Sequence, residues 1–298
     1  MATEHTPFEN RMVDLGVWLL KGVCALPRPA GRFFGRLLGD ATAFFSKNRR
    51  HVCHTNIALC FPDMPLRNRI DLSNEVFQNN GIGLIETGWA WWSDPEPFWN
   101  DLEIEGAEHL ETALAVGKGV LLIGGHYSAL DLGGLLFAKI APRFAATYRP
   151  HNFQRLENEL VAGRGRFMDL IDRNDVRGIF RALDRNQIVW FAPDQDLGDD
   201  HAHVFSDFFG VPAATTPALR KMARRGATPL SISFHRRSDG GYRMTLIPWP
   251  ADVTNMDDQA FADRMNQIIE SQVAREPGQY MWVHRRFKTR PAGGVDLY

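Results

Sequence analysis

Short runs rich in β-branched and aromatic residues alternate with helical patterns after residue 101, and this alternation restricts the fold more than any other feature. It is typical of an α/β sheet that is at least partly parallel and is covered by helices. Ligand sites in such sheets gather beyond the carboxyl ends of the strands. We therefore predict a mixed, largely parallel sheet flanked by helices. Its expected strands are Val120–Ile123, Phe144–Tyr148, Ile188–Ala192, Leu230–Phe234 and Tyr242–Ile247.

Residues 1–100 have helical patterns with proline-containing breaks and no convincing strand. We therefore predict a division into an N-terminal helical region, residues 1–100, and an α/β catalytic domain, residues 101–298. The first apolar run, Leu15–Leu26, contains Lys21 and is shorter than the roughly twenty apolar residues that a membrane-spanning helix needs. No small-residue cleavage site follows it, so we expect it to be retained.

A second amphipathic stretch follows Pro27 and Pro29. Its apolar residues recur at helical spacing, and Arg32 and Arg36 are placed to reach lipid headgroups. This pattern predicts a helix that lies in a membrane interface, so we expect residues 1–100 to associate with a membrane. Two helices packed on the protein's own core would give the same pattern. The apolar residues are Phe33, Phe34, Leu37, Leu38, Ala41, Phe44 and Phe45.

Charge is unevenly distributed although the net charge is only −1. Residues 28–50 hold six basic residues against the single acid Asp40, and Arg285, Arg286, Lys288 and Arg290 form a second cluster. Such clusters indicate an anionic partner. The three candidates are a phospholipid surface, an acidic carrier protein and a nucleic acid. The basic stretch near the C-terminus is short and no nucleic-acid-binding module accompanies it, so we expect no nucleic acid as partner.

Three cysteines, Cys24, Cys53 and Cys60, make an odd number without metal-type spacing. They suggest neither a disulfide framework nor a zinc site, and they fit a reducing, cytosol-facing location.

His126 follows the predicted strand Val120–Ile123 and two glycines, and Asp131 follows five residues later at the start of an apolar helix. A carboxylate that holds one ring nitrogen leaves the other free to act as a general base toward a substrate hydroxyl. The same spacing also suits a buried histidine satisfied by a helix-capping aspartate. Ser128 lacks the Gly-x-Ser-x-Gly setting of a hydrolase nucleophile.

Two further groups lie near the same predicted sheet edge. Arg149 and Asn152 follow the second strand, and Arg164 lies downstream. A cation at this edge would bind a phosphate or steady the oxyanion of an attacked thioester, although Arg149 would also suit an ordinary surface ion pair. Asp194 and Asp196 follow the third strand.

The segment from Asp194 to His203 contains four aspartates and two histidines. It could hold a metal ion and make the protein a hydrolase, but it lacks the glycine position and closing glutamate of a calcium-binding loop. A structural role in an active-site loop is the alternative. The segment 205–216 joins aromatic and small residues, which suit either the wall of an acyl-chain channel or core packing.

Together these segments resemble the late acyltransferases of lipid A biosynthesis, the lauroyl and myristoyl transferases of Gram-negative inner membranes. Six ordered blocks over most of the chain carry this resemblance. They are His126-x4-Asp131, Tyr148-Arg149-Pro150-His151-Asn152, Arg164-Gly165-Arg166, Pro193-Asp194-Gln195-Asp196-Leu197-Gly198, Phe208-Phe209-Gly210 with Thr215-Thr216, and the stretch 279–291.

The resemblance implies transfer of a fatty acyl chain from acyl carrier protein to a hydroxyl of a 3-hydroxyacyl chain on a Kdo-bearing lipid A precursor. His126 would be the base and Asp131 its orienting partner. Arg149, Asn152, Arg164, Asp194 and Asp196 would bind substrate or border the site. No metal and no bound cofactor would be needed, and the enzyme would lie on the cytoplasmic side of the inner membrane.

Three alternatives remain at this point. Many lipid A members carry glutamate at the acidic position, whereas this chain has Asp131, as phospholipid-synthesising relatives commonly do. The acceptor would then be a glycerophospholipid or a glycolipid. A metal-dependent hydrolase built on the Asp194–His203 segment is the alternative from another class. A third is an inert lipid-binding protein that keeps the fold.

Overall fold

A computed structural model describes residues 7–298. Five helices come first: α1 Pro7–Cys24, α2 Arg28–Phe45, α3 Lys47–Cys60, α4 Leu66–Trp92 and α5 Glu96–Asn100. The rest of the chain alternates strands and helices: β1 Leu102–Glu105, α6 Ala107–Ala115, β2 Val120–Gly124, α7 Leu130–Phe137, β3 Phe144–Tyr148, α8 Gln154–Arg164, β4 Met168–Asp172, α9 Val176–Asp184, β5 Ile188–Phe191, β6 Val204–Phe208, β7 Val211–Thr215, α10 Ala218–Arg224, β8 Thr228–Arg236, β9 Tyr242–Pro248, η1 Val253–Asn255, α11 Asp258–Val273 and η2 Pro277–Gln279.

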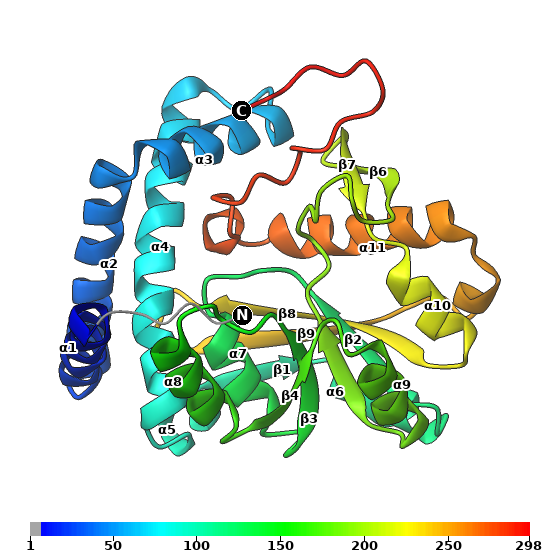
Figure 1. The fold of residues 1–298 in the computed structure, drawn as a ribbon, viewed down its shortest axis with the longest axis horizontal. Coiled ribbons are helices and arrows are strands. Elements are labelled where there is room, and N and C mark those ends of the chain that lie inside the picture. The colour runs from blue at the N-terminus through cyan, green and yellow to red at the C-terminus, as the bar shows by residue number, and fades with distance from the viewer. Residues whose placement is uncertain (1–6) are drawn as a thin grey trace.

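A seven-stranded sheet forms the centre of the molecule, in the order β1-β9-β8-β2-β5-β3-β4 (Figure 1). All neighbouring pairs are parallel except β8 with β9. The predicted mixed, largely parallel sheet is therefore confirmed, with all five expected strands in place. The prediction missed the two edge strands, β1 and β4, and the separate antiparallel hairpin of β6 and β7.

The central strands are fully buried, which explains why their sequences are apolar without interruption. β2 and β5 are buried at every position, whereas β1 alternates between half-buried and exposed residues. Helices cover the two faces of the sheet, and α11 lies above it in Figure 1. Because β2, β5 and β3 are parallel neighbours, the loops that leave their carboxyl ends meet at one edge.

α2 packs closely on the long helix α4 because it presents a stripe of glycines. Gly31, Gly35 and Gly39 are its buried residues and recur every four positions, so they lie on one face. A Cβ atom at Gly39 would overlap the carbonyl oxygen of Phe77, and one at Gly81 would overlap the carbonyl oxygen of Gly35. The two helix backbones therefore touch directly, and no larger side chain fits between them.

A buried ion pair joins α4 to the sheet. Arg236 at the end of β8 donates two hydrogen bonds, of 2.7 and 2.6 Å, to the carboxylate of Glu86. Tyr242 of β9 donates to the same carboxylate at 2.7 Å, and Asn79 accepts from Arg236 at 2.6 Å. Glu86 is fully buried. Its charge is thus completely satisfied by hydrogen bonds, which is the condition for keeping an ion in the interior.

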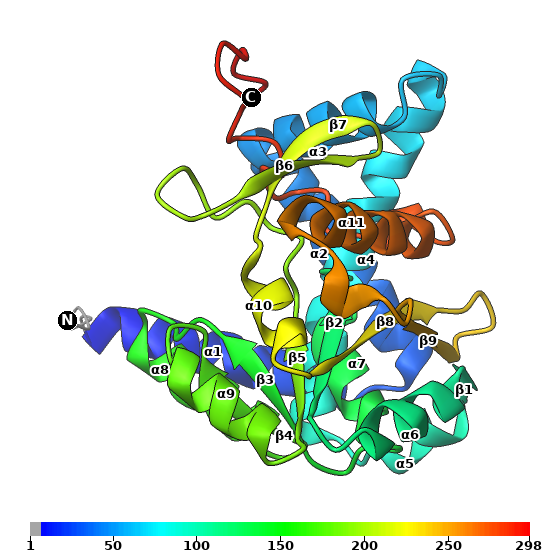
Figure 2. The ribbon, with the colours of Figure 1, turned by 90° about the vertical axis from the view of Figure 1, so that its right-hand side faces the viewer.

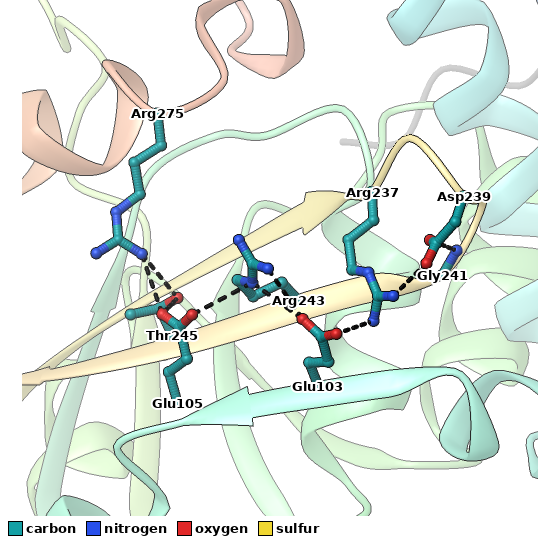
Figure 3. A network of polar contacts seen from close by, with 8 residues as sticks. All are labelled: Glu103, Glu105, Arg237, Asp239, Gly241, Arg243, Thr245 and Arg275. Carbon is teal, nitrogen blue, oxygen red and sulfur yellow. Dashed lines mark hydrogen bonds and ion pairs between the residues drawn. The ribbon is translucent and has the colours of Figure 1, made fainter.

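A second network lies on the surface, across the parallel pair β1 and β9 (Figure 3). Glu103 contacts Arg237 and Arg243, and Glu105 contacts Arg243 at 3.2 Å and Arg275 at 3.1 Å. Opposite charges on neighbouring strands favour this register, although each pair is exposed to solvent.

The C-terminal basic cluster is not the open anionic-partner surface that its sequence suggested. Arg286 is buried and donates hydrogen bonds to the carbonyl of Ala214 at 2.6 Å and the hydroxyl of Thr215 at 3.0 Å. Arg290 donates to the carbonyl of Pro212 at 2.9 Å. These cations hold the β6–β7 hairpin, because buried backbone carbonyls there need donors. Arg285 and Lys288 remain exposed.

The opposite face of α2, and most of α1, leave large apolar side chains in solvent. Twelve of the twenty exposed large apolar side chains of the described part of the chain lie between residues 8 and 45. The glycine face of α2 packs on α4, as the packing interpretation expects, and its aromatic face is open. Association of this face with a membrane stays a prediction. Between residues 7 and 298, no helix combines the length and the apolar character that a membrane crossing requires.

Candidate active site

The loop that carries His126 leaves the carboxyl end of β2 and is braced by the C-terminal segment. The amide of Met281 donates to the carbonyl of His126 at 3.0 Å, and the amide of Ser128 donates to the carbonyl of Gln279 at 2.8 Å. Tyr127 and Tyr280 form the bridge between these segments. The position of His126 therefore depends on residues about 150 positions away in the sequence.

His126 is held by Asp194, which follows the neighbouring strand β5. The ring Nδ1 lies 2.6 Å from Asp194 Oδ1, and the backbone amide of His126 donates to Asp194 Oδ2 at 2.8 Å. The Tyr280 hydroxyl donates a further hydrogen bond to this carboxylate. The Asp194 side chain is 1% exposed and the His126 side chain 20% exposed. One ring nitrogen is thus fixed, and the other, Nε2, forms no hydrogen bond within residues 7–298.

The electrostatic interaction between His126 and Asp194 shifts the pKa of both side chains. Burial alone would raise the pKa of Asp194, but the charge and hydrogen bonds of His126 lower it to about 2. Burial lowers the pKa of His126, and the Asp194 carboxylate outweighs this effect, so the net pKa lies above its usual value of 6.5. Arg164 opposes the rise through its positive charge. The pair therefore stabilises an imidazolium, which is the form that a base takes after it has accepted a proton.

Asp131 does not contact the imidazole, which corrects the predicted pairing of His126 with Asp131. Its carboxylate accepts two hydrogen bonds from Arg164, at 2.6 and 3.0 Å, and one from the Trp91 indole at 3.1 Å. Asp131 lies in the first turn of α7, where its side chain faces the end of α8 and α4. A catalytic role for Asp131 stays a prediction.

His126 and the Asp131–Arg164 pair line one cleft of about 510 Å³, a volume typical of small-ligand sites. His126, Asp131, Arg149 and Arg164 line it, so the structure brings together four of the predicted residues. Asp194 lies directly behind His126. The remaining lining is largely apolar and includes Leu130, Ala146, Met168, Ile179, Trp190, Phe191, Leu219 and Met222.

Besides Asp194, two more predicted binding residues lie outside the cleft lining. Asn152 is exposed on the loop before α8. Asp196 is 2% exposed and accepts hydrogen bonds from the amide of Thr289 at 2.8 Å and its hydroxyl at 2.9 Å. Asp196 therefore anchors the C-terminal segment. A role for it in substrate binding stays a prediction.

Two further hypotheses from the sequence concern a metal site in the segment 194–203 and a channel wall in the segment 205–216. Among the described residues, no group of three or more histidine, cysteine or acidic side chains is arranged to hold a metal ion. The segment 205–216 forms the β6–β7 hairpin beside α11, and only Thr216 from it lines the cleft. Core packing thus describes this segment, and the expected channel wall comes from β3, β5, α9 and α10 instead.

Sequence reasoning missed the role of two residues. Asp194 was expected to bind substrate, yet it holds the His126 ring. The available signal was its position after β5, the strand next to β2. Trp91 gave no signal, because one tryptophan within a helical pattern does not reveal its partner.

Comparison with known proteins identifies the family of this chain. Residues 7–289 match the family model described as bacterial lipid A biosynthesis acyltransferase. The chain is 39% identical to the lipid A biosynthesis palmitoleoyltransferase of Escherichia coli strain K12, over 92% of this chain and 90% of that protein. It is 36% identical to the lauroyltransferase of the same organism, over 95% and 94%, and 27% identical to the myristoyltransferase, over 95% and 89%. The chain belongs to the bacterial lipid A biosynthesis acyltransferase family.

Proposed function

We propose that this acyltransferase moves a fatty acyl chain from acyl carrier protein to a hydroxyl of a 3-hydroxyacyl chain on a Kdo-bearing lipid A precursor. The observation that carries the proposal is the His126–Asp194 pair at an apolar cleft large enough to hold an acyl chain. A neutral alcohol is a weak nucleophile, so a positioned base is the first requirement of this chemistry.

The reaction follows from the geometry of the pair. Nε2 of His126 takes the proton of the acceptor hydroxyl as its oxygen attacks the thioester carbonyl. Collapse of the tetrahedral intermediate breaks the carbon–sulfur bond, and the imidazolium returns the proton to the leaving thiolate. The products are an ester and a free thiol, and no outside reagent is consumed. Asp194 stabilises the imidazolium between the two proton transfers.

The arginines of the cleft supply positive charge. Arg149 is exposed where β3 ends, and Arg164 is fixed by Asp131 within the same cleft. Phosphate groups of the acceptor or of the carrier's prosthetic arm suit these guanidinium groups, as does the oxyanion of the intermediate. No metal ion and no bound cofactor takes part in this scheme.

We place the enzyme on the cytoplasmic side of the inner membrane. The exposed apolar side chains of α1 and α2 lie within one stretch of sequence, residues 8–45. Arg36 and Lys47 are exposed beside them, and neither forms an ion pair within residues 7–298. Apolar area flanked by cations is the composition of a helix that lies in an anionic lipid interface.

Purified protein in detergent, incubated with acyl carrier protein thioesters and the Kdo-bearing tetra-acyl precursor, tests the proposal. The acceptor should gain one acyl mass with the wild type and not with His126→Ala. His51→Ala serves as a matched control, because His51 is exposed on α3 and does not line the cleft. Loss of activity in both variants, or in neither, would contradict the role of His126.

Two other outcomes separate the alternatives. If only a glycerophospholipid or a glycolipid gains the acyl mass, the acceptor assignment is wrong and the reaction class stands. If hydrolysis of the thioester occurs without an acceptor and stops after exhaustive chelation, the chain acts as a metal-dependent hydrolase.

A further inference from the structure

Two adjacent helices beside the cleft, α9 and α10, expose a concentration of positive charge that the catalytic scheme does not use. We call the exposed side chains of these helices and their C-terminal caps the α9–α10 basic face. The acids interspersed within this stretch are Asp175 and Asp184. The members of the face are Arg177, Arg181, Arg185, Lys221, Arg224 and Arg225.

The arrangement of α9 gathers its charge on one side. Arg177, Arg181 and Arg185 recur at four-residue intervals, so they project from one face, while Ile179 and Leu183 are buried. The guanidinium of Arg225 lies 4.3 Å from the centroid of the Phe180 ring, which joins the two helices into one surface.

Most of these cations lack an internal counter-charge. Within residues 7–298, Arg181 pairs with Asp175 at 3.5 Å, and the other five members form no ion pair. Elsewhere on the surface arginines are commonly paired, as Arg143 is with Asp169. Unpaired like charges repel one another, so a partner that supplies negative charge would be attracted to this face and stabilise it.

The face also stands at the cleft. Val176 and Ile179 of α9 and Leu219 and Met222 of α10 line the cavity, so the helices that carry the arginines are also its walls. A partner bound on this face would sit within reach of the cavity that contains His126.

The position of the face distinguishes a protein partner from a lipid surface. α1 and α2, which expose the aromatic side chains, lie at the left of Figure 1, whereas α9 and α10 lie at its right. A bilayer in contact with α1 and α2 would leave α9 and α10 on the aqueous side. Figure 2 shows α10 and α9 close together on the side turned away from α2.

We propose that the α9–α10 basic face is the docking surface for the acidic carrier protein that delivers the acyl thioester. This inference rests on the proposed function, since it needs a protein-bound donor. Complementary charge accelerates encounter and orients the partner, so the carrier's acyl arm would enter the cleft between the two helices.

Charge reversal tests the docking surface. Arg177→Glu/Lys221→Glu changes one unpaired cation on each helix near the cleft. Arg67→Glu/Arg285→Glu makes the same change in net charge at exposed positions away from it. We expect the first variant to raise KM for lauroyl-loaded acyl carrier protein roughly tenfold or more, with kcat within about twofold. Its binding of fluorescently labelled holo-carrier should weaken in parallel and lose most of its salt dependence.

The outcomes separate this proposal from the proposed function. If the wild type transfers acyl groups from the carrier while both variants keep the wild-type KM and binding, the docking surface is wrong and the donor assignment stands. Equal losses in both variants also contradict it. If the wild type neither binds nor uses the carrier, the donor assignment and the docking surface both fail. If the α9–α10 variant instead loses binding to phosphatidylglycerol vesicles alone, the face contacts lipid.

Discussion

At the residue scale, the charge of Asp194 is expected to set the pH dependence of transfer. His126 acts as a base when deprotonated, so the rate should rise with pH through a pKa that lies above 6.5. Asp194→Asn removes the charge that raises this pKa, so the acid limb should move to lower pH. The pH-independent kcat/KM should also fall by about 10²–10⁴-fold, because the imidazolium loses its stabilising partner.

A pH profile of kcat/KM measures both effects in one experiment. Asp200→Asn is the matched control, since Asp200 is an exposed aspartate of the same loop. An acid limb that stays in place in Asp194→Asn would show that this carboxylate does not act on His126.

The residues of the site were identifiable from sequence, but their pairing was not. His126 and Asp194 follow strands, and Asp131 and Arg164 lie in end turns of helices near the predicted sheet edge. The choice between Asp131 and Asp194 as partner of the ring depends on which other hydrogen-bond donors each carboxylate meets. Arg164 and Trp91 supply that competition for Asp131, and no spacing along the chain reveals where α8 and α4 end relative to α7.

At the element scale, two carboxylates that join neighbouring elements should differ greatly in how much they stabilise the fold. Glu86 joins α4 to β8, and Glu103 joins β1 to β9. Glu86→Gln leaves the Arg236 guanidinium without its counter-charge in the interior, and the free energy of unfolding should fall by about 3–5 kcal/mol. Glu103→Gln removes a carboxylate of the exposed network in Figure 3, where the change should stay within about 1 kcal/mol. Urea unfolding in one detergent compares them.

Both variants replace a glutamate that contacts arginine by glutamine, but the two sites differ in burial. The Glu86 side chain is 0% exposed and the Glu103 side chain is 45% exposed. Similar losses for both would mean that burial does not govern the strength of these pairs. High salt should diminish the Glu103 effect and leave the Glu86 effect nearly unchanged.

The glycine stripe of α2 predicts a reversal of the usual effect of alanine in a helix. Gly39→Ala should lower the free energy of unfolding by about 1–3 kcal/mol, because the new methyl group meets the backbone at Phe77. Gly16→Ala in α1 is the control, since no atom lies within 4 Å of its added Cβ. There the higher helix propensity of alanine should stabilise by up to about 1 kcal/mol. Thermal unfolding of both variants shows whether the signs are opposite.

The fold was predictable where elements are buried on both faces, and less so where they are not. β2, β3 and β5 are continuous apolar or small runs, so they were visible in the sequence. The edge strand β4 contains Asp169 and Asp172, and β1 contains Glu103 and Glu105, because one side of an edge strand faces water. The contact of α2 with α4 was hidden for a different reason: glycine carries no apolar side chain, so a pattern of hydrophobicity does not register it.

At the scale of the whole molecule, the exposed apolar surface of α1 and α2 is separated from the α9–α10 basic face. α1 and α2 expose aromatic groups on one side, and α9 and α10 expose cations on the other (Figure 1). A net charge of −1 conceals this separation, because acids such as the exposed Asp207 and the half-buried Asp263 lie elsewhere, near the β6–β7 hairpin. An acceptor held in a bilayer and a donor carried in water would approach His126 from different sides.

This separation predicts that membrane binding depends on the α1–α2 surface and not on exposed apolar residues in general. Trp18→Ser/Phe44→Ser removes two side chains that are each 69% exposed, one from each helix. Burying such a group in lipid contributes about 1.5–3 kcal/mol, so partitioning into phosphatidylglycerol and phosphatidylethanolamine vesicles should fall by at least roughly tenfold. Leu66→Ser/Val295→Ser removes side chains that are 68% and 72% exposed elsewhere and should leave partitioning unchanged. Vesicle sedimentation measures both, and thermal unfolding should be nearly the same for all, because none of the four side chains is buried. Equal partitioning of the two double variants would mean that the aromatic face of α1 and α2 does not contact the bilayer.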